Sequence, residues 1–161
     1  GVSGLNGGVN RGNEPCYSGS VTAATEGFLL GIPSLAISLA LFSSENFSSA
    51  ARIATEMVQR FENDKFHGAV LLNVNVPDIP YDELQGIEVT RLGRRHKAEP
   101  VVKSQTPRGE TVYWVGAAGP AQDIGEGTDF LAIQRNRVSV TPLQIDLTRY
   151  GQLDAVKQWL K

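Results

Sequence analysis

The spacing of hydrophobic residues predicts alternating helices and strands in the first half of the chain. Apolar side chains recur at helical intervals over residues 21–30, and this stripe ends at Gly31, with Pro33 beyond it. The stripe consists of Val21, Ala24, Phe28 and Leu29. Residues 35–41 form a nearly continuous apolar run, which is typical of a strand buried on both faces of a parallel sheet.

A second helical stripe follows, with Ser43 or Ser44 placed to cap its start and Asp64 and Lys65 near its end. Its apolar positions are Phe47, Ala50, Ala51, Ala54, Met57, Val58 and Phe61. Residues 69–76 predict another strand, which ends at Pro77. A strand, a helix and a strand joined by short connections predict a right-handed βαβ crossover in an α/β layer structure.

Beyond Pro80 the pattern becomes alternating and predicts a hairpin. Residues 86–92 and 111–115 alternate in the manner of strands, and a turn pattern at 106–110 lies between them. We expect these two segments to pair as an extended β-hairpin. Because a two-stranded ribbon is marginally stable alone, its apolar residues are expected to rest on another subunit.

The last part of the chain predicts a strand over residues 137–143, extended by 144–147, and then a terminal helix. The apolar face of that helix consists of Leu153, Val156, Trp159 and Leu160. We therefore divide the chain into an α/β core (1–85), a β-hairpin oligomerisation arm (86–127) and a C-terminal strand and helix (128–161) that pack on a partner subunit.

Glycine is concentrated in residues 1–12, ahead of the first predicted helix, and this arrangement indicates an anion site. If Ser18 is the N-cap, the N–H groups of Gly19, Ser20 and Val21 are unpaired and lie at the positive end of the helix dipole, where phosphate binds. Asn6 and Asn10 add amide side chains to the loop. The alternative is an ordinary strand-to-helix connection. No GxGxxG or GxxxxGK[ST] motif is present to indicate a dinucleotide or a P-loop site.

Composition narrows the class of protein. The chain has 161 residues and a net charge of −2, which indicates one globular domain and argues against a nucleic-acid polymer as partner. The lone cysteine, Cys16, excludes an internal disulfide and is compatible with the cytoplasm; a packing role is favoured over a nucleophile. No membrane-spanning run or signal peptide is visible.

Two charged clusters each allow two interpretations. Arg91, Arg94, Arg95 and His96 could bind phosphate across a dimer, or could form a solvated turn and ion pairs with acids such as Glu99. Asp123, Glu126 and Asp129 could bind a metal, although their spacing does not match an EF-hand. In the simpler interpretation, Thr128 and Asp129 cap the apolar segment 130–133.

Six motifs in order resemble the SurE family of nucleotidases across nearly the whole chain. They are VSGLN at residues 2–6, YSGSV at 17–21, LNVNVP at 72–77, RLGRRH at 91–96, EGTDF at 126–130 and SVTPL at 139–143. The resemblance implies a Rossmann-like three-layer α/β fold with a parallel sheet, incomplete in this chain, plus the hairpin arm and C-terminal helix. It also implies a homodimer or homotetramer built through that arm and helix.

The resemblance further implies a phosphomonoesterase of nucleoside monophosphates, a 5'- or 3'-nucleotidase that in some members also acts on polyphosphate. By positional match, Asn6 would bind a divalent metal, Mg²⁺ or Mn²⁺, while Asn10, Ser18, Gly19 and Ser20 would line the phosphate pocket. Water activated by the metal would attack phosphorus, and the backbone amides around residues 18–20 would stabilise the developing charge. No residue can be assigned as general base or nucleophile.

Three departures from the family pattern qualify this expectation. The chain has no Asp-Asp pair, whereas the family holds its metal with two adjacent aspartates; we therefore expect a truncated chain that is inactive alone. Ser20 stands where threonine is usual, and Tyr150 where histidine is frequent. Two other functions stay open: a non-catalytic phosphate- or nucleotide-binding module, and an oligomerisation element.

Overall fold

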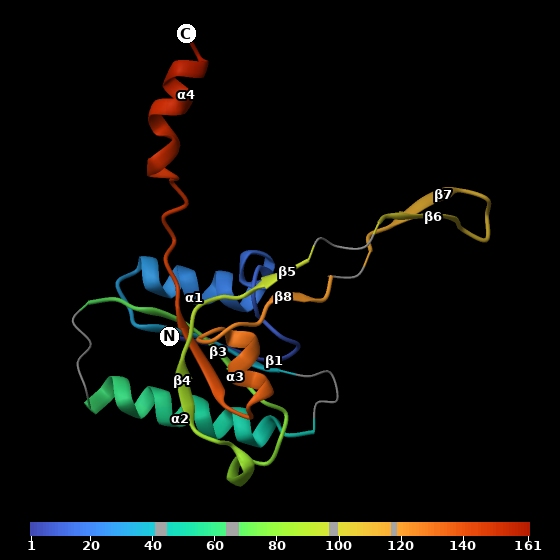
Figure 1. Ribbon diagram of the computed structural model, residues 1–161. Coiled ribbons are helices and arrows are strands. Elements are labelled where there is room, and N and C mark those ends of the chain that lie inside the picture. Colours follow the sequence, from blue (N-terminus) through green and yellow to red (C-terminus); the bar gives the residue numbers. More distant parts are fainter. Residues whose placement is uncertain (41–44, 64–67, 97–99, 117–118) are drawn as a thin grey trace.

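In the computed structural model, which describes residues 1–40, 45–63, 68–96, 100–116 and 119–161, one mixed sheet is covered by helices on both faces (Figure 1). The described part of the chain gives this sheet five strands. Their order is β1 (Val2–Gly7), β2 (Ser34–Leu39), β3 (Leu71–Val76), β9 (Val138–Pro142) and β4 (Ile87–Val89). The predicted α/β class is confirmed.

Helices α1 (Gly19–Leu29) and α2 (Phe47–Asn63) pack on opposite faces of the sheet, which gives the expected three layers. Alternate residues of β2 separate the two cores: Leu35 and Ile37 contact the α2 side, whereas Ala36 contacts α1. Both faces of β2 are buried, because helices cover both, and this explains its continuous apolar run. The capping residues proposed for α2, Ser43 and Ser44, lie outside the described residues, as do Asp64 and Lys65.

The sheet is not wholly parallel. β1, β2 and β3 run parallel, as predicted, but β9 pairs antiparallel with β3, and β4 pairs parallel with β9. The expected pairing of residues 86–92 with 111–115 is wrong, because 87–89 form the β4 edge of the main sheet. An alternating pattern marks a strand with one covered face, and it does not select the partner strand.

The hairpin itself is built from other residues. β6 (Val102–Gln105) pairs antiparallel with β7 (Thr111–Trp114), and β5 (Arg94–Arg95) pairs with β8 (Ala121–Asp123) nearer the body. We call residues 94–123 the arm. Figure 1 shows β6 and β7 projecting far from the sheet.

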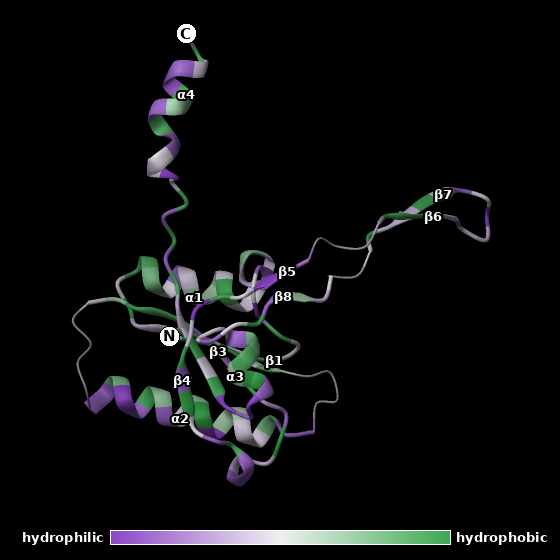
Figure 2. Cartoon of the chain, in the orientation of Figure 1, coloured by the Kyte–Doolittle hydropathy of each residue, from purple (hydrophilic) through white to green (hydrophobic). Residues whose placement is uncertain are grey.

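The C-terminal part leaves the body after β9. Residues 143–149 form no strand, so the predicted extension over 144–147 is wrong, and η3 (Tyr150–Gln152) leads into α4 (Leu153–Trp159). The Tyr150 hydroxyl donates to Asp146 Oδ2 at 2.7 Å, and this hydrogen bond lowers the pKa of the Asp146 carboxyl. The predicted terminal helix is confirmed, with its apolar face exposed (Figure 2).

Three short elements complete the described chain. η1 (Glu14–Tyr17) precedes α1, η2 (Tyr81–Glu83) follows β3, and α3 (Asp129–Gln134) precedes β9. We call residues 8–13, between β1 and η1, the Asn10 loop. None of the described helices is both long and apolar enough to cross a membrane.

Candidate functional site

Asn6 lies at the carboxyl end of β1, where open α/β sheets commonly bind ligands. Its Oδ1 atom accepts hydrogen bonds from two hydroxyls, Ser38 Oγ at 2.9 Å and Ser20 Oγ at 3.2 Å. Its Nδ2 atom donates to the carbonyl oxygen of Gly8 at 3.3 Å. The structure thus brings together Asn6 and Ser20, two residues proposed from the sequence.

Asn10 is 4% exposed, and its polar groups bind the strands beneath it. The side chain of Asn75 recognises both main-chain groups of Asn10: Asn75 Oδ1 accepts from Asn10 N at 2.9 Å, and Asn75 Nδ2 donates to Asn10 O at 3.1 Å. Asn73 Nδ2 donates to the same carbonyl at 2.7 Å. Asn10 Nδ2 donates to Ser38 Oγ at 2.6 Å.

These contacts fix the direction of the Ser38 hydroxyl bond. An amide NH₂ can only donate, so Ser38 Oγ accepts from Asn10 and directs its single proton to Asn6 Oδ1. Asn75, Asn10, Ser38 and Asn6 therefore form one continuous network. It runs over the α1 face of β2 and β3, since Ser38 and Asn75 alternate in phase with Ala36 and Leu71 of the α1 core.

The amino terminus of α1 supplies the N–H groups that an anion could reach. Ser18 is the N-cap, as predicted, but its Oγ accepts from Val21 N at 3.3 Å, so the expectation of an unpaired Val21 N–H is wrong. The N–H groups of Gly19 and Ser20 have no acceptor in the described part of the chain. A side chain added at Gly19 would meet no heavy atom within 4 Å, so this helix end is open.

The main-chain amides of the Asn10 loop serve another purpose. Asn10 N, Arg11 N and Gly12 N donate in succession to Asn75 Oδ1, Glu14 Oε2 and Asp129 Oδ2. Their N–H groups are thus committed within the protein, and Gly12 adopts the left-handed conformation at φ 58°. Asn75, Glu14 and Asp129, which lie outside the loop, therefore hold these three N–H groups, whereas those of Gly19 and Ser20 at the start of α1 have no acceptor among the described residues.

The oxygen atoms around Asn6 do not fit a hard divalent cation by themselves. They are amide and hydroxyl oxygens from Asn6, Ser20 and Ser38, whereas Mg²⁺ and Mn²⁺ favour sets that include carboxylates. Among the described residues, no three acidic, histidine or cysteine side chains gather as a metal site. The buried carboxylate of Asp129 already accepts three main-chain hydrogen bonds.

The acidic residues weighed as metal ligands have separate partners. Asp123 pairs with Arg91 at 2.6 Å, and Glu126 pairs with Arg135 at 2.6 Å. These arginines lower the pKa of both carboxyls. Thr128 caps α3, as predicted, because its Oγ1 accepts from Leu131 N at 3.3 Å.

Two of the four residues of the basic cluster, Arg91 and Arg95, form ion pairs within the chain. Besides the Arg91 pair, Arg95 Nη2 lies 3.0 Å from Glu14 Oε1. Arg91 and Arg95 therefore form ion pairs, as one of the two interpretations expected. Glu99, the acid named in that interpretation, lies outside the described residues. Cys16 is free and exposed, which contradicts the packing role favoured from the sequence.

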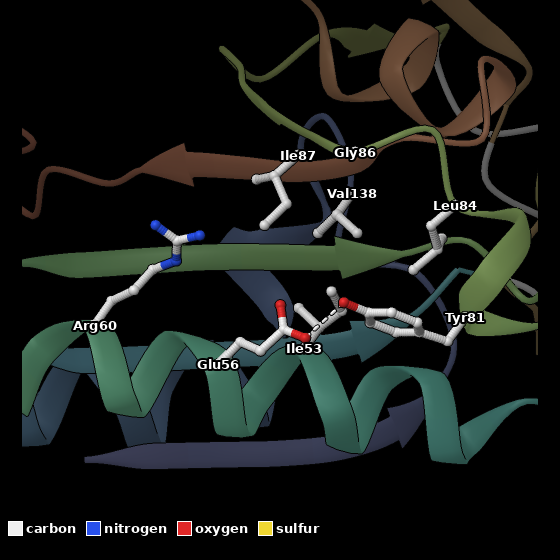
Figure 3. Close-up of a pocket in the computed structure, with 8 residues that line it drawn as sticks. All are labelled: Ile53, Glu56, Arg60, Tyr81, Leu84, Gly86, Ile87 and Val138. Atoms are coloured by element: carbon white, nitrogen blue, oxygen red, sulfur yellow. Dashed lines mark hydrogen bonds between the residues drawn. The ribbon is translucent and has the colours of Figure 1, made fainter.

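A cavity of about 330 Å³ lies away from these residues, between α2 and the β4 edge (Figure 3). The Tyr81 hydroxyl donates to Glu56 Oε1 at 2.6 Å, and the Arg52 guanidinium lies 3.6 Å from the Tyr81 ring centre. The bond to Glu56 raises the pKa of Tyr81. None of the proposed phosphate-site residues lines this cavity.

Comparison with known proteins identifies the family. The family model described as survival protein SurE matches residues 2–99. The chain belongs to the SurE family. It is 69% identical to "5'-nucleotidase SurE" of Nitrosomonas europaea and 59% identical to the protein of that name from Methylobacillus flagellatus, in both cases over 99% of this chain.

A solved SurE structure supports the fold. The crystal structure of the SurE protein from Aquifex aeolicus matches 99% of the chain with a TM-score of 0.81 and 39% identity. The chain spans 64% of the length of that protein and of the two relatives above.

Two residues of the site network, Ser38 and Asn75, were not singled out from the sequence, and the contact of Asp129 with the Asn10 loop was not foreseen. Ser38 and Asn75 are polar residues within apolar strand segments, and Asn73 stands two positions before Asn75 on the same face. Polar residues that interrupt an apolar strand could have indicated Ser38 and Asn75 as site residues, since buried polar groups require hydrogen-bond partners. The distant partner of Asp129, Gly12, leaves no comparable pattern.

Proposed function

We propose that this SurE-family chain is the phosphate-binding part of a phosphomonoesterase that hydrolyses nucleoside monophosphates. The supporting observation is the open start of α1, where the N–H groups of Gly19 and Ser20 have no acceptor among the described residues and the helix dipole favours an anion. The nucleotidase names of the relatives are the second support.

In this proposal the phosphate accepts hydrogen bonds from the Gly19 and Ser20 N–H groups and from the Ser20 hydroxyl, whose single proton turns from Asn6 Oδ1 to the phosphate while Asn6 Oδ1 keeps its bond from Ser38. The Ser20 hydroxyl lies 3.2 Å from Asn6 Oδ1, so a phosphate on Ser20 would also lie beside the Asn6 amide. These donors are placed to stabilise negative charge that develops on phosphate oxygens. Ser18 contributes by capping α1, and Asn10 by supporting Asn6 through Ser38.

This proposal includes a divalent metal only if further ligands, in addition to Asn6 and its neighbouring hydroxyls, bind it. The neutral oxygens at Asn6 are insufficient, and we propose that the required carboxylates come from outside residues 1–161. This deficit also favours a second candidate, a module that binds phosphate without hydrolysing it. The two differ in whether a longer protein containing this chain turns over a nucleotide.

Calorimetric titration of the 161-residue chain with inorganic phosphate and AMP tests the binding site. We expect both to bind, and Ser20→Ala to weaken binding about tenfold, the effect of roughly one hydrogen bond. Thr25→Ala is the control, because the Thr25 hydroxyl donates to the Val21 carbonyl within α1 and does not contact Asn6 or the start of the helix in the described part of the chain. Absence of binding to the unmodified chain would overturn the proposed site.

A separate assay tests whether the chain lacks the carboxylate ligands that the metal needs. It measures the release of phosphate from AMP with added Mn²⁺. The chain alone is expected to show no hydrolysis above background. Turnover by this polypeptide would show that the carboxylates are not needed from elsewhere. Binding without turnover, in a longer protein that contains the chain, would select the non-catalytic module.

A further inference from the structure

Asp129, the first residue of α3, is a fully buried carboxylate bound entirely by main-chain amides. Its Oδ2 atom accepts from Gly12 N at 2.7 Å, and its Oδ1 atom accepts from Gly93 N at 2.8 Å and Phe130 N at 2.9 Å. Gly12 belongs to the Asn10 loop, and Gly93 directly precedes the arm. One side chain therefore joins two segments that lie about 80 residues apart in the sequence.

The packing at this junction is close on both sides. A Cβ atom on Gly12 would lie 3.0 Å from the Phe130 ring, and one on Gly93 would lie 2.6 Å from the same ring and 2.5 Å from Asp123 O. A shift of either segment towards the Phe130 ring would displace this side chain, which is 3% exposed. The carboxylate thus acts at a point where the loop and the base of the arm already touch a common side chain.

A second carboxylate ties the same two segments. Glu14 accepts from Arg11 N at 2.9 Å through Oε2 and pairs with Arg95 of β5 at 3.0 Å through Oε1. The Arg11 and Arg95 guanidinium groups lie 4.9 and 5.2 Å from the Phe130 ring centre. Burial, followed by the neighbouring Arg95 charge, lowers the pKa of Arg11. The junction around Phe130 therefore combines an apolar ring with charged groups, and it lies at the Arg11–Gly12 end of the Asn10 loop.

We propose that Asp129 is a positioning residue, which couples the base of the arm to the phosphate site by fixing Gly12 in place. Asn75 holds the loop at Asn10, and Asp129 holds it two residues later, immediately before the segment that enters α1. If Gly12 is released, that segment can move, and the Gly19 and Ser20 N–H groups lose their alignment. This inference rests on the proposed phosphate-binding function.

Asp129→Asn is the most selective test, because asparagine is nearly isosteric and retains one oxygen. If that oxygen occupies the Oδ1 position, it still accepts from Gly93 and Phe130, while the new NH₂ group faces the Gly12 N–H as donor against donor. The loop end is then released while the arm base stays bound. Glu126→Gln is the matched control: it also removes one carboxylate charge, but from an exposed side chain paired with Arg135.

Two measurements separate positioning from charge and from the proposed function. Hydrogen exchange of the 161-residue chain is expected to speed up at least about tenfold at the Gly12 amide in Asp129→Asn, with Gly93 unchanged. Inorganic phosphate should bind about tenfold more weakly, at a temperature where thermal melting shows the variant folded. Charge alone predicts the opposite sign, because removing a negative group favours an anion.

The outcomes are distinct. Phosphate affinity that is unchanged or improved in Asp129→Asn, with an unmodified chain that binds phosphate, overturns the positioning role. Gly12 exchange that matches the unmodified chain also overturns it. If the unmodified chain fails to bind phosphate, the proposed function is overturned instead. Accelerated Gly12 exchange in Asp129→Asn would then still show that Asp129 holds the loop, but this contact would have no role in phosphate binding. Weakened binding in Glu126→Gln equal to that in Asp129→Asn would assign the effect to a general disturbance of the fold and overturn the inference.

Discussion

At the scale of single residues, the candidate site depends on one buried hydroxyl. Ser38 Oγ accepts from Asn10 and donates to Asn6, so it transmits the position of the loop to the amide at the end of β1. Ser38 itself is fully buried, which excludes bulk water as a substitute partner. Asn6 is thereby oriented by a side chain of the neighbouring strand, while Ser20 of α1 reaches it from the other side.

Replacing Ser38 by alanine tests this network. Ser38→Ala leaves the buried Asn10 NH₂ group without its acceptor, so we expect a loss of about 1–3 kcal/mol in the free energy of unfolding. Phosphate binding should also weaken, because Asn6 and Ser20 lose their alignment. Ser49→Ala removes another buried hydroxyl, which donates to Ile79 O at 2.8 Å on the α2 side. It should destabilise the fold without changing phosphate affinity.

Denaturant unfolding and phosphate titration, carried out on both variants, provide the comparison. Equal phosphate affinity in Ser38→Ala and in the unmodified chain would remove Ser38 from the site. Weaker binding in both serine variants would attribute the effect to general destabilisation.

The sequence predicted the residues whose roles are local better than those whose roles depend on distant contacts. The Ser18 and Thr128 caps follow from residue type and position beside a helix, and both are observed. By contrast, Asp129 was interpreted as a helix cap or a metal ligand, whereas its carboxylate accepts from Gly12 N and Gly93 N. A side chain's distant partner depends on how the elements pack, and local pattern does not encode it.

At the scale of elements, hydropathy predicted α1, α2, α4, β2, β3 and β9 near their observed positions, but not β5, β6 and β8 of the arm, and not how the strands pair. α2 carries its apolar stripe towards the sheet, with Ala50, Ile53 and Met57 in the core, as its period requires. β4 and β9 were both indicated as strands, yet their place and direction in the sheet were not. An alternating segment satisfies its pattern equally well in a hairpin and at the edge of a mixed sheet.

The base of the arm is held by the Arg91–Asp123 ion pair, and this predicts a pH dependence. The hydrogen bond from Arg91, and then that from Gly125 N, lowers the pKa of Asp123 below its ordinary value of 3.8. A depressed carboxyl pKa contributes stability that is present above the unfolded value and is lost as the pH falls through the folded one. The contact should therefore persist at pH 5 and weaken below about pH 4.

NMR titration of the Asp123 carboxyl carbon measures this effect. In Arg91→Gln the pKa should rise towards its ordinary value. Glu126 serves as an internal control, because Arg135 lowers its pKa independently and that shift should survive the substitution. An Asp123 midpoint that is the same with and without Arg91 would contradict the assigned cause.

At the scale of the whole molecule, two elements project from a well-packed body. The arm and α4 stand away from the body (Figure 1), and both include hydrophobic residues (Figure 2) whose side chains are exposed. These are Val101, Val102, Tyr113, Trp114 and Val115 on the arm, and Leu153, Val156, Trp159 and Leu160 at the C-terminus. Clustered exposed apolar residues of this kind mark contact surfaces, in contrast to scattered single ones. The sequence predicted the terminal helix and a hairpin, although the hairpin pairs other residues than expected, and the partner subunit expected for both stays a prediction.

We therefore predict that the chain self-associates through the arm and α4. Static light scattering over micromolar concentrations should give a mass of at least two chains. Two lysine substitutions on α4, Val156→Lys and Trp159→Lys together, should lower that mass, because burying ammonium groups in an apolar contact is unfavourable.

The control is Lys157→Ala, on the same helix, where the side chain pairs with Asp154 at 3.1 Å. Because α4 leaves the body after β9, the lysine variant should retain the far-ultraviolet circular dichroism of a folded sheet. A mass of one chain at every concentration would contradict the predicted assembly, and a variant that associates as strongly as the unmodified chain would exclude α4 from the contact.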